Sequence, residues 1–268
     1  MSRRPDYNTS RDPSIAVDHL AVDPLSHAWS LKMLSLHRDA CVSTTYENSD
    51  GWACVTEMEA EASRWDRTAY PSAKRLITFD GNSELLLRIA FEETSKARSV
   101  LKIHEPITRS LVANGAGYHL AQTFLSYSTD GTTWKDQETS TGVTEHHELD
   151  ENAERLLSEN GYTGQELAEY FRDRASWFGL TIGSRCVSAC LVYRNYRDIW
   201  EIGGVYTVAE ERGKGYAKAV VRSATRTLLH SRRTPRYVFR SDNEASRAVA
   251  EGVGLKHDVT IEHFIAGE

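Results

Sequence analysis

The chain has 268 residues, of which 40% are hydrophobic, 9% aromatic and 26% charged, and its formal net charge is −6 at pH 7. This composition is typical of a globular protein of one large domain or two ordinary ones, which excludes intrinsic disorder and fibrous folds. No stretch reaches the about 18 consecutive apolar residues of a membrane span, and the polar N-terminus lacks a signal-peptide core. We therefore expect a cytoplasmic protein with no membrane partner and a flexible arm over residues 1–13.

Helix-like and strand-like patterns alternate through the first half of the chain, which is typical of strands backed by helices. The predicted elements are a helix over 25–36, strands over 41–46, 52–56 and 75–79, a helix over 84–91, a strand over 100–103, a helix over 107–112 and a strand over 118–127. An aromatic-rich loop over 65–71 separates the second strand from the third.

A polar, turn-forming stretch over 128–142 then interrupts the pattern, and we expect a domain boundary there. The predicted elements beyond it are a strand over 143–149, helices over 151–157 and 165–171, strands over 177–182, 186–193 and 199–207, a helix over 214–229, a strand over 237–239, a helix over 244–251 and a strand over 259–265. Both halves end on the same strand-helix-strand-helix-strand order. We therefore predict two related α/β modules in tandem, over residues 14–130 and 143–268.

Neither cysteines nor histidines form a convincing metal-ligand pattern. The cysteines are few and scattered, and we expect them to be small core residues in a reducing compartment: Cys41, Cys54, Cys186 and Cys190. Adjacent residues on an extended segment point to opposite faces, so we interpret His146-His147-Glu148 as a polar strand end and not as a set of metal ligands. The sequence analysis therefore predicts no metal.

Positive charge is concentrated in one window of this acidic chain. Residues 211–240 hold nine basic residues and one acid, a local charge of +8, which leaves −14 for the rest. Nucleic-acid binding would favour basic residues interleaved with exposed aromatics over a broad face. Here the charge lies on and after a single predicted helix, which suits a compact polyanion better than a nucleic acid.

The most informative segment runs from Val205 to Ala217, where a strand passes through a loop with two glycines into an amphipathic helix. Glycines let the backbone approach a ligand, and the N–H groups and dipole of a helix N-terminus attract phosphate. The spacing does not fit a dinucleotide fingerprint, because Lys218 stands where its third glycine is required. It does not fit a Walker loop either, because Val208 stands at that loop's first glycine.

Arg212-x-x-Gly215-x-Ala217 resembles the loop that holds the pyrophosphate of coenzyme A in the GNAT superfamily of N-acetyltransferases. The downstream helix that starts at Asn243 and closes near Gly254-Leu255 resembles that superfamily as well, with leucine in place of phenylalanine. The resemblance covers residues 177–265. It implies a mixed, mostly antiparallel GNAT-type sheet flanked by helices, within the α/β (α+β) class.

The resemblance also implies acetyl-CoA as co-substrate and a set of residues that bind it. The strand end at 205–207 would pair with the pantetheine arm, and the loop at 212–217 would hold the pyrophosphate. The implied cofactor-binding residues are Val205, Tyr206, Thr207, Arg212, Gly213, Lys214, Gly215, Tyr216, Ala217, Asn243 and Ser246. Lys218 or Arg222 would either meet the 3′-phosphate or lie in solvent. The N-terminal module has no comparable loop, so we expect it to be a degenerate or accessory module.

Glu201 lies eleven residues before Arg212, at the spacing of the general base in the histone-acetylating branch of the superfamily. The alternative is that Glu201 pairs with Arg197 or another cation. Ala250 stands where many members have the tyrosine that protonates the departing thiolate, so the general acid is unassigned, with Ser246 or Tyr206 as weak substitutes.

The sequence analysis thus predicts an acetyl-CoA-dependent N-acetyltransferase that transfers an acyl group to a primary amine by direct attack on the thioester. The acceptor would be a small-molecule amine, a lysine side chain or an N-terminal amine, and no nucleic-acid partner is expected. Acyl chain length and oligomeric state are left open. The alternative is a catalytically weak CoA-binding sensor or scaffold.

Overall fold

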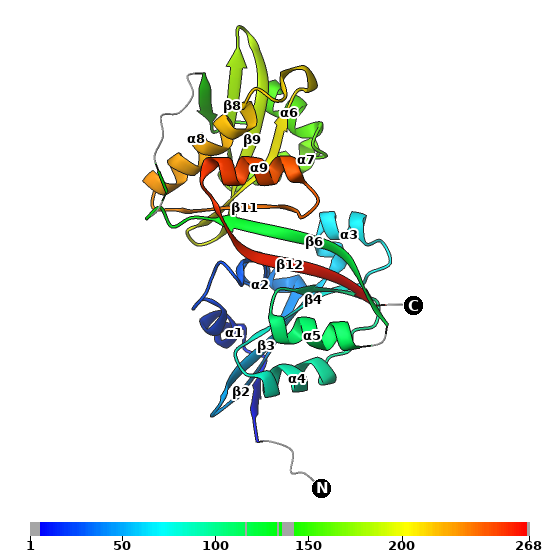
Figure 1. Cartoon of the computed structure of the whole chain (residues 1–268). Helices are drawn as coiled ribbons and strands as arrows, with labels where there is room; N and C mark the ends of the chain where they lie inside the picture. The colour runs from blue at the N-terminus through cyan, green and yellow to red at the C-terminus, as the bar shows by residue number, and fades with distance from the viewer. Residues whose placement is uncertain (1–5, 116, 133, 136–141, 267–268) are drawn as a thin grey trace. The chain divides into compact units, whose positions relative to one another are not determined.

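The computed structural model describes residues 6–115, 117–132, 134–135 and 142–266, and it divides into two compact units (Figure 1). Unit 1 consists of Met1–Phe124 and Val259–Glu268, and unit 2 of Leu125–Asp258. The division lies close to the predicted break at 128–142. The end of the last strand, expected in the C-terminal module, groups with unit 1 because it pairs with a strand of that unit.

Unit 1 is a sheet with helices packed on it. Its elements are β1 (Asn8–Ser10), α1 (Pro13–Leu20), α2 (Ala28–Leu36), β2 (Cys41–Asn48), β3 (Gly51–Glu59), α3 (Arg64–Ala69), β4 (Arg75–Gly81), α4 (Glu84–Glu93), β5 (Ser99–Ile103), α5 (Pro106–Asn114) and the first part of β6 (Tyr118–Ser128). One-turn helices also occur at Arg38–Ala40 and Ala60–Ala62. The strand order is β1-β2-β3-β4-β5, followed by the end of β12 (Lys256–Ala266). Of the registers along this order, only that between β4 and β5 is parallel.

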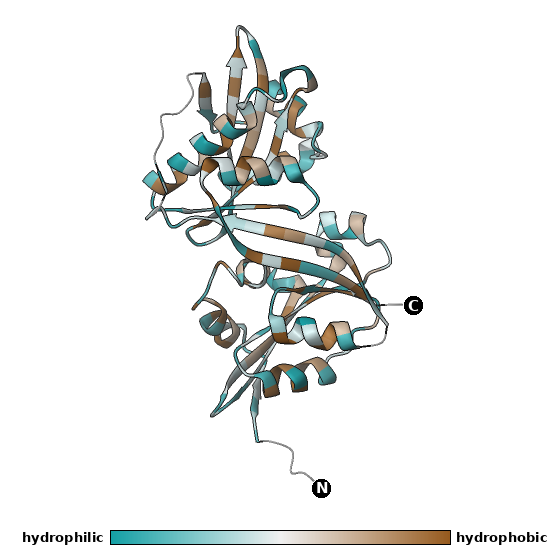
Figure 2. Ribbon diagram, in the orientation of Figure 1, coloured by the Kyte–Doolittle hydropathy of each residue, from teal (hydrophilic) through white to brown (hydrophobic). Residues whose placement is uncertain are grey.

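Unit 2 has the same architecture. Its elements are β7 (Val143–His146), α6 (Glu151–Ser158), α7 (Gly164–Arg172), β8 (Ser176–Ile182), β9 (Arg185–Tyr196), β10 (Ile199–Thr207), the one-turn helix η3 (Ala209–Glu211), α8 (Tyr216–His230), β11 (Thr234–Arg240) and α9 (Glu244–Val253). The strand order is β7-β8-β9-β10-β11, followed by β6, and β10 and β11 are parallel. Hydrophobic and hydrophilic residues alternate along α8, which packs on β8, β9 and β10 (Figure 2).

The order of elements repeats along the chain. Residues 143–266 form a strand, two helices, three strands, a helix, a strand, a helix and a final strand, and residues 8–128 follow the same order with one addition, the short helix α3 between the second and third of the three strands. The final strands are exchanged, because β12 lies beside β5 and β6 lies beside β11. The predicted fold class, a mixed and mostly antiparallel sheet flanked by helices, is confirmed.

Each unit has its own hydrophobic core. In unit 1 the core includes Val55, Ile77, Phe79, Leu86 and Leu101, and in unit 2 it centres on residues of β8, β9 and α8. All four cysteines are buried thiols, as expected. No helix in the described ranges combines the length and hydrophobicity needed to cross a membrane.

The expectation of a flexible arm over residues 1–13 was wrong for residues 8–10 and for Pro13. Residues 8–10 form an edge strand against Thr45–Glu47 of β2, and a helix starts at Pro13. Pairing of three polar residues with a distant strand leaves no periodic signal in the sequence. The start of the helix does have a signal in the sequence, because Asp12 caps it and proline occupies its first position.

Candidate functional site

Strands β10 and β11 form the framework of the site predicted in unit 2. Their parallel pairing runs from Ile199 with Thr234 to Ile202 with Tyr237. Both strands continue beyond that point, β10 to Thr207 and β11 to Arg240, so they diverge. Divergence of two parallel strands exposes backbone hydrogen-bonding groups that an extended ligand can pair with.

A β-bulge interrupts β10 within the diverging segment. The register against β9 shifts between Gly203 and Tyr206, because three steps along β10 match two steps along β9. Gly204 has φ +59, and a Cβ there would lie 2.8 Å from Leu157 Cδ2, so only glycine fits. A bulge leaves a residue unpaired and redirects its peptide groups. Adjacent glycines inside a strand pattern, here Gly203 and Gly204, are the sequence signal of such a bulge.

The glycine loop leads directly into the N-terminus of α8. Gly213 and Gly215 have φ +77 and +85, and a Cβ at either would meet no heavy atom within 4 Å. Gly215 is the N-cap residue, and no side chain caps the helix, which begins with Tyr216 and Ala217. The first N–H groups of a helix have no intrahelical acceptor, and the helix dipole adds positive potential there. The loop therefore has the geometry of an anion site.

The matching loop of unit 1 uses its donors internally. The backbone N–H groups of Asn82 and Ser83 donate to the carbonyl oxygen of Trp52 at 3.1 and 3.3 Å. The Ser83 hydroxyl accepts from the N–H of Leu86, and Glu84 occupies the first turn of α4. An anion would have to displace these contacts and approach a carboxylate. This supports the expectation that the first module lacks a phosphate loop.

Predicted cofactor-binding side chains follow the ends of both diverging strands. Arg212 donates from Nε to the carbonyl oxygen of Thr207 at 3.0 Å, and its guanidinium lies 5.6 Å from the ring centroid of Tyr206. After β11, Asn243 caps α9 by accepting from the N–H of Ser246 at 3.0 Å. The hydroxyl of Ser246 in turn accepts from Tyr237 at 3.0 Å. The structure thus joins Arg212 to the end of β10 and ties Asn243 and Ser246 to β11.

The basic residues of the 211–240 window do not gather around the glycine loop. The sequence had led us to expect that this charge faces one compact polyanion. Arg236 is buried, Arg233 stacks over Trp200 at 3.9 Å, and Arg222 donates to the carbonyl oxygen of Gly252 at 2.8 Å. A helix of 15 residues spans about 22 Å, so residues after α8 lie far from its N-terminus. Arg212, Lys214 and Lys218 are the window's cations in or next to the loop, and Lys214 already pairs with Glu211 at 2.8 Å.

Glu201 accepts hydrogen bonds from three side chains. Tyr193 donates to Oε2 at 2.9 Å, and Arg236 donates to Oε1 at 2.8 Å. Asn195 also donates to Oε1. The cation is therefore Arg236, which the parallel register places opposite Glu201, and not Arg197. These donors compete with a proton for the lone pairs of the carboxylate, which opposes a general-base role for Glu201.

Three tyrosines surround Glu201, and sequence reasoning did not identify them as site residues. The ring centroids of Tyr170 and Tyr193 are 4.4 Å apart, and those of Tyr162 and Tyr170 are 6.2 Å apart. Burial, with the nearby tyrosines and Glu201, raises the pKa of Tyr162 and Tyr193 and raises that of Tyr170 to about 12. The hydroxyls therefore stay protonated near neutral pH. Their positions in the sequence, on a loop, a helix and a strand, offered no common pattern.

Ala250 lies in the core of unit 2, with 0% of its surface exposed. The position that resembled the family's general acid is therefore filled by a buried methyl group. No described residue takes over this role through a contact that the structure shows.

Comparison with known proteins identifies the family of this region. Residues 137–264 match the family model described as GNAT acetyltransferase. This match confirms the resemblance to GNAT acetyltransferases over that region of the chain. Comparison with curated protein sequences gives no match.

Solved structures resemble the fold of nearly the whole chain. A GCN5-related N-acetyltransferase from Kribbella flavida matches with a TM-score of 0.63 and 12% identity, covering 91% of this chain and 96% of that one. A GCN5-related N-acetyltransferase from Sphaerobacter thermophilus gives 0.58 and 14%, covering 98% and 96%. A putative GNAT-family acetyltransferase from Novosphingobium aromaticivorans gives 0.52 and 16%, covering 91% and 99%. At these identities the likeness shows the fold, and it extends over both units.

Proposed function

We propose that unit 2 is an acetyl-CoA-dependent N-acyltransferase that transfers the acyl group to a primary amine. The observation that carries the proposal is the uncapped N-terminus of α8 behind the Gly213–Gly215 loop, inside a region that matches the GNAT acetyltransferase family. In this proposal the N–H groups of residues 213–217 bind the pyrophosphate, with Arg212 and Lys214 adding charge. The backbone of residues 205–207 pairs with the pantetheine arm, and Asn243 and Ser246 line the opposite strand.

The bulge in β10 would place a backbone N–H toward the thioester carbonyl. Attack by the amine forms the C–N bond of the amide and breaks the C–S bond of the thioester, and the oxygen carries negative charge in between. Glu201 would take the proton that the amine must lose, directly or through water. Because a thiolate is a tolerable leaving group, the buried Ala250 slows the reaction without preventing it.

The surroundings of Glu201 favour a cationic acceptor. The rings of Tyr162, Tyr170 and Tyr193 lie together near Glu201. The carboxylate of Glu166, which accepts a hydrogen bond from the N–H of Thr163 at the start of α7, is also close to Tyr162. Aromatic faces and carboxylates both attract ammonium groups. A polyamine, an aminoglycoside or a lysine side chain has this chemistry.

The alternative function is a CoA-binding sensor or scaffold with little turnover. Two observations favour it: the ion pair between Glu201 and Arg236, and the methyl group at position 250. It shares the CoA site with the proposed enzyme and differs only in catalysis.

Titration of CoA into the purified full chain by calorimetry tests the shared site. We expect Gly215→Ala to weaken binding tenfold or more, about 1.4 kcal/mol, because a Cβ at φ +85 forces the loop to shift. Gly117→Ala is the matched control, since Gly117 has φ +96, open surroundings and a place in unit 1. Equal affinity in the wild type and Gly215→Ala would remove the loop from the site.

Turnover separates the two functions. The wild type is expected to release thiol from acetyl-CoA in the presence of an amine, and Glu201→Gln to lower kcat about 100-fold with CoA affinity retained. Retained affinity also shows that unit 2 of the variant is folded. Tight CoA binding by the wild type, without turnover over a panel of polyamines, aminoglycosides and lysine peptides, would establish the sensor instead.

A further inference from the structure

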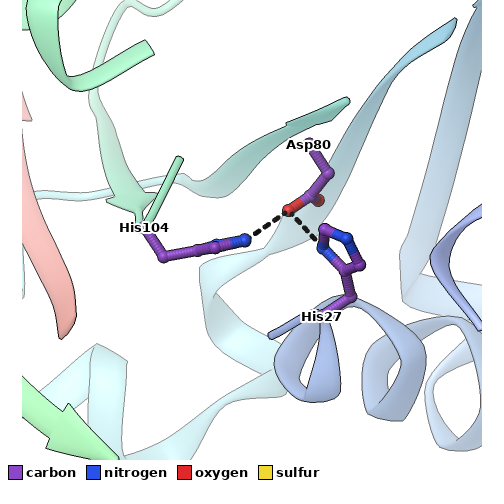
Figure 3. Close-up of side chains that lie close together, drawn as sticks. All are labelled: His27, Asp80 and His104. Atoms are coloured by element: carbon purple, nitrogen blue, oxygen red, sulfur yellow. Dashed lines mark hydrogen bonds and ion pairs between the residues drawn. The ribbon is translucent and has the colours of Figure 1, made fainter. Parts of the chain in front are cut away.

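Unit 1 holds a cluster of two histidines and one aspartate at the carboxyl ends of its parallel strands. The register of β4 and β5 runs from Arg75 with Ser99 to Ile77 with Leu101. Asp80 and His104 each lie three residues beyond the last pair, so the topology brings them to the same edge. His27 reaches them from the residue before α2 (Figure 3).

The three side chains converge on one point. His27 Nδ1 lies 3.1 Å from Asp80 Oδ1, and His104 Nε2 lies 3.6 Å from the same oxygen. One ligand atom from each residue lies within 4.8 Å of the other two. Ligands at about 2.0–2.1 Å from a tetrahedral zinc ion are about 3.3 Å apart, so both distances to Asp80 already match a shared metal. The two imidazoles would need to close by at most about 1.5 Å, which follows from the 4.8 Å limit.

A second layer of hydroxyl groups orients the carboxylate. Ser30 Oγ donates to Asp80 Oδ2 at 3.0 Å, and Thr78 Oγ1 donates to the same oxygen at 2.9 Å. Oδ1 is thereby left to face the two imidazoles. Such outer-layer hydrogen bonds are typical of metal-binding carboxylates, and they hold the ligand in place before the metal arrives.

Burial and access also suit a metal ion. The Asp80 side chain is 0% exposed, and a buried carboxylate requires compensating charge. The His27 and His104 side chains retain 12% and 14% exposure, so the cluster is in partial contact with solvent. Two imidazoles and one carboxylate suit zinc and similar transition metals, whereas Mg²⁺ and Ca²⁺ prefer oxygen ligands throughout.

We propose that His27, Asp80 and His104 bind one divalent transition-metal ion in unit 1, with zinc as the best-matched metal. This site is independent of the acyltransferase proposed for unit 2, and the proposal departs from the expectation of no metal. Asp80 lies 53 residues after His27 and 24 residues before His104, so the ligands form no short motif that the sequence could reveal.

The test uses the full chain without a histidine tag, stripped with a chelator and titrated with Zn²⁺ by calorimetry. We expect about one equivalent to bind, and Co²⁺ to give the intense visible absorption of a tetrahedral site. His27→Ala and His104→Ala should each weaken Zn²⁺ binding about 100-fold or more. His119→Ala, which removes an exposed histidine of β6, should leave binding unchanged.

Ser30→Ala keeps all three ligands and removes one outer-layer hydrogen bond. It therefore provides a second test of the site if the ligand variants do not fold. It should lower the affinity for Zn²⁺ about 10-fold or more. The proposal is overturned if the wild type does not bind Zn²⁺ or Co²⁺, or if His27→Ala and His104→Ala bind Zn²⁺ as tightly as the wild type does. Either result would make the cluster a buried ion pair alone.

Discussion

Gly204 shows how a single residue without a side chain shapes the site. The bulge needs a backbone with φ +59, and the space above it is filled by Leu157 and Tyr162. A side chain would strain the backbone and also push these neighbours away. The glycine therefore serves both the geometry of the strand and the packing of α6 on the sheet.

We predict that Gly204→Ala lowers the free energy of unfolding by about 2–4 kcal/mol, the sum of left-handed strain and overpacking. Gly183→Ala is the matched control, because Gly183 has φ +60 and no atom within 4 Å of a built Cβ. The control should lose only about 1–2 kcal/mol. Urea denaturation measures both, and equal losses would show that Leu157 yields without cost.

At the scale of elements, α4 and α8 hold the same place in the repeated order but differ at their N-termini. A serine side chain caps α4, and the loop before it donates to Trp52. A glycine precedes α8 and no side chain caps the helix, and a Cβ built on Gly213 or Gly215 would meet no heavy atom within 4 Å. Capping stabilises a helix, whereas an uncapped N-terminus keeps its donors for a ligand.

A buried ion pair links α3 to β5. Lys102 Nζ lies 2.8 Å from Asp66 Oδ2, and the two side chains are only 6% and 3% exposed. Burial lowers the pKa of Lys102, and the charge of Asp66 opposes this effect. The lysine also lies over the ring of Trp29 at 4.6 Å. Removal of one partner leaves the other buried without compensation.

We predict that Lys102→Met lowers the free energy of unfolding by about 3–5 kcal/mol, because Asp66 stays behind as an isolated buried charge. Adding Asp66→Asn to this variant should recover part of the loss. Arg88→Met, which breaks the exposed pair of Arg88 with Glu84, is the control and should cost under about 1 kcal/mol. Denaturant unfolding checks the series, and a loss in Lys102→Met no larger than in the control would contradict it.

At the scale of the whole molecule, two repeats of one order of elements have diverged in chemistry. Unit 2 keeps a glycine loop and a helix N-terminus without a side-chain cap between β10 and α8. Unit 1 has a buried carboxylate, two imidazoles and a capped helix at the matching place. A ligand with several phosphates should therefore bind only one of the two units.

We predict that saturating CoA slows amide hydrogen exchange in residues 203–217 of unit 2 and leaves residues 81–86 of unit 1 unchanged. A ligand that binds only the native state stabilises the part of the chain it contacts, by about 2.7 kcal/mol at 100 times its Kd if that part opens locally. Exchange followed by mass spectrometry resolves both loops. Protection of residues 81–86 would show that the first module also binds the cofactor.

The sequence predicted most helices and strands because their hydrophobic periodicity is local. The amphipathic helix after Gly215 is one example, and the structure shows it as α8, starting at Tyr216. The exchange of β6 and β12 was not predicted, since either final strand has a pattern that suits either sheet. The edge strand β1 was missed because three polar residues show no period.

The candidate site divides in the same way. The glycine loop and the following helix are contiguous in the chain, so residue types and spacing alone indicated an anion site in a GNAT-like module. The environment of Glu201 is not contiguous. Arg236 stands opposite Glu201 only because β10 and β11 pair in parallel at that register, and the tyrosines meet there only after α7 packs beside β9. By itself, the sequence determined most helices and strands and the glycine loop, because each of these depends on residues that are neighbours in the chain. Only the tertiary structure decided which charges pair with Glu201 and which histidines meet Asp80, because those contacts join residues that are far apart in the chain.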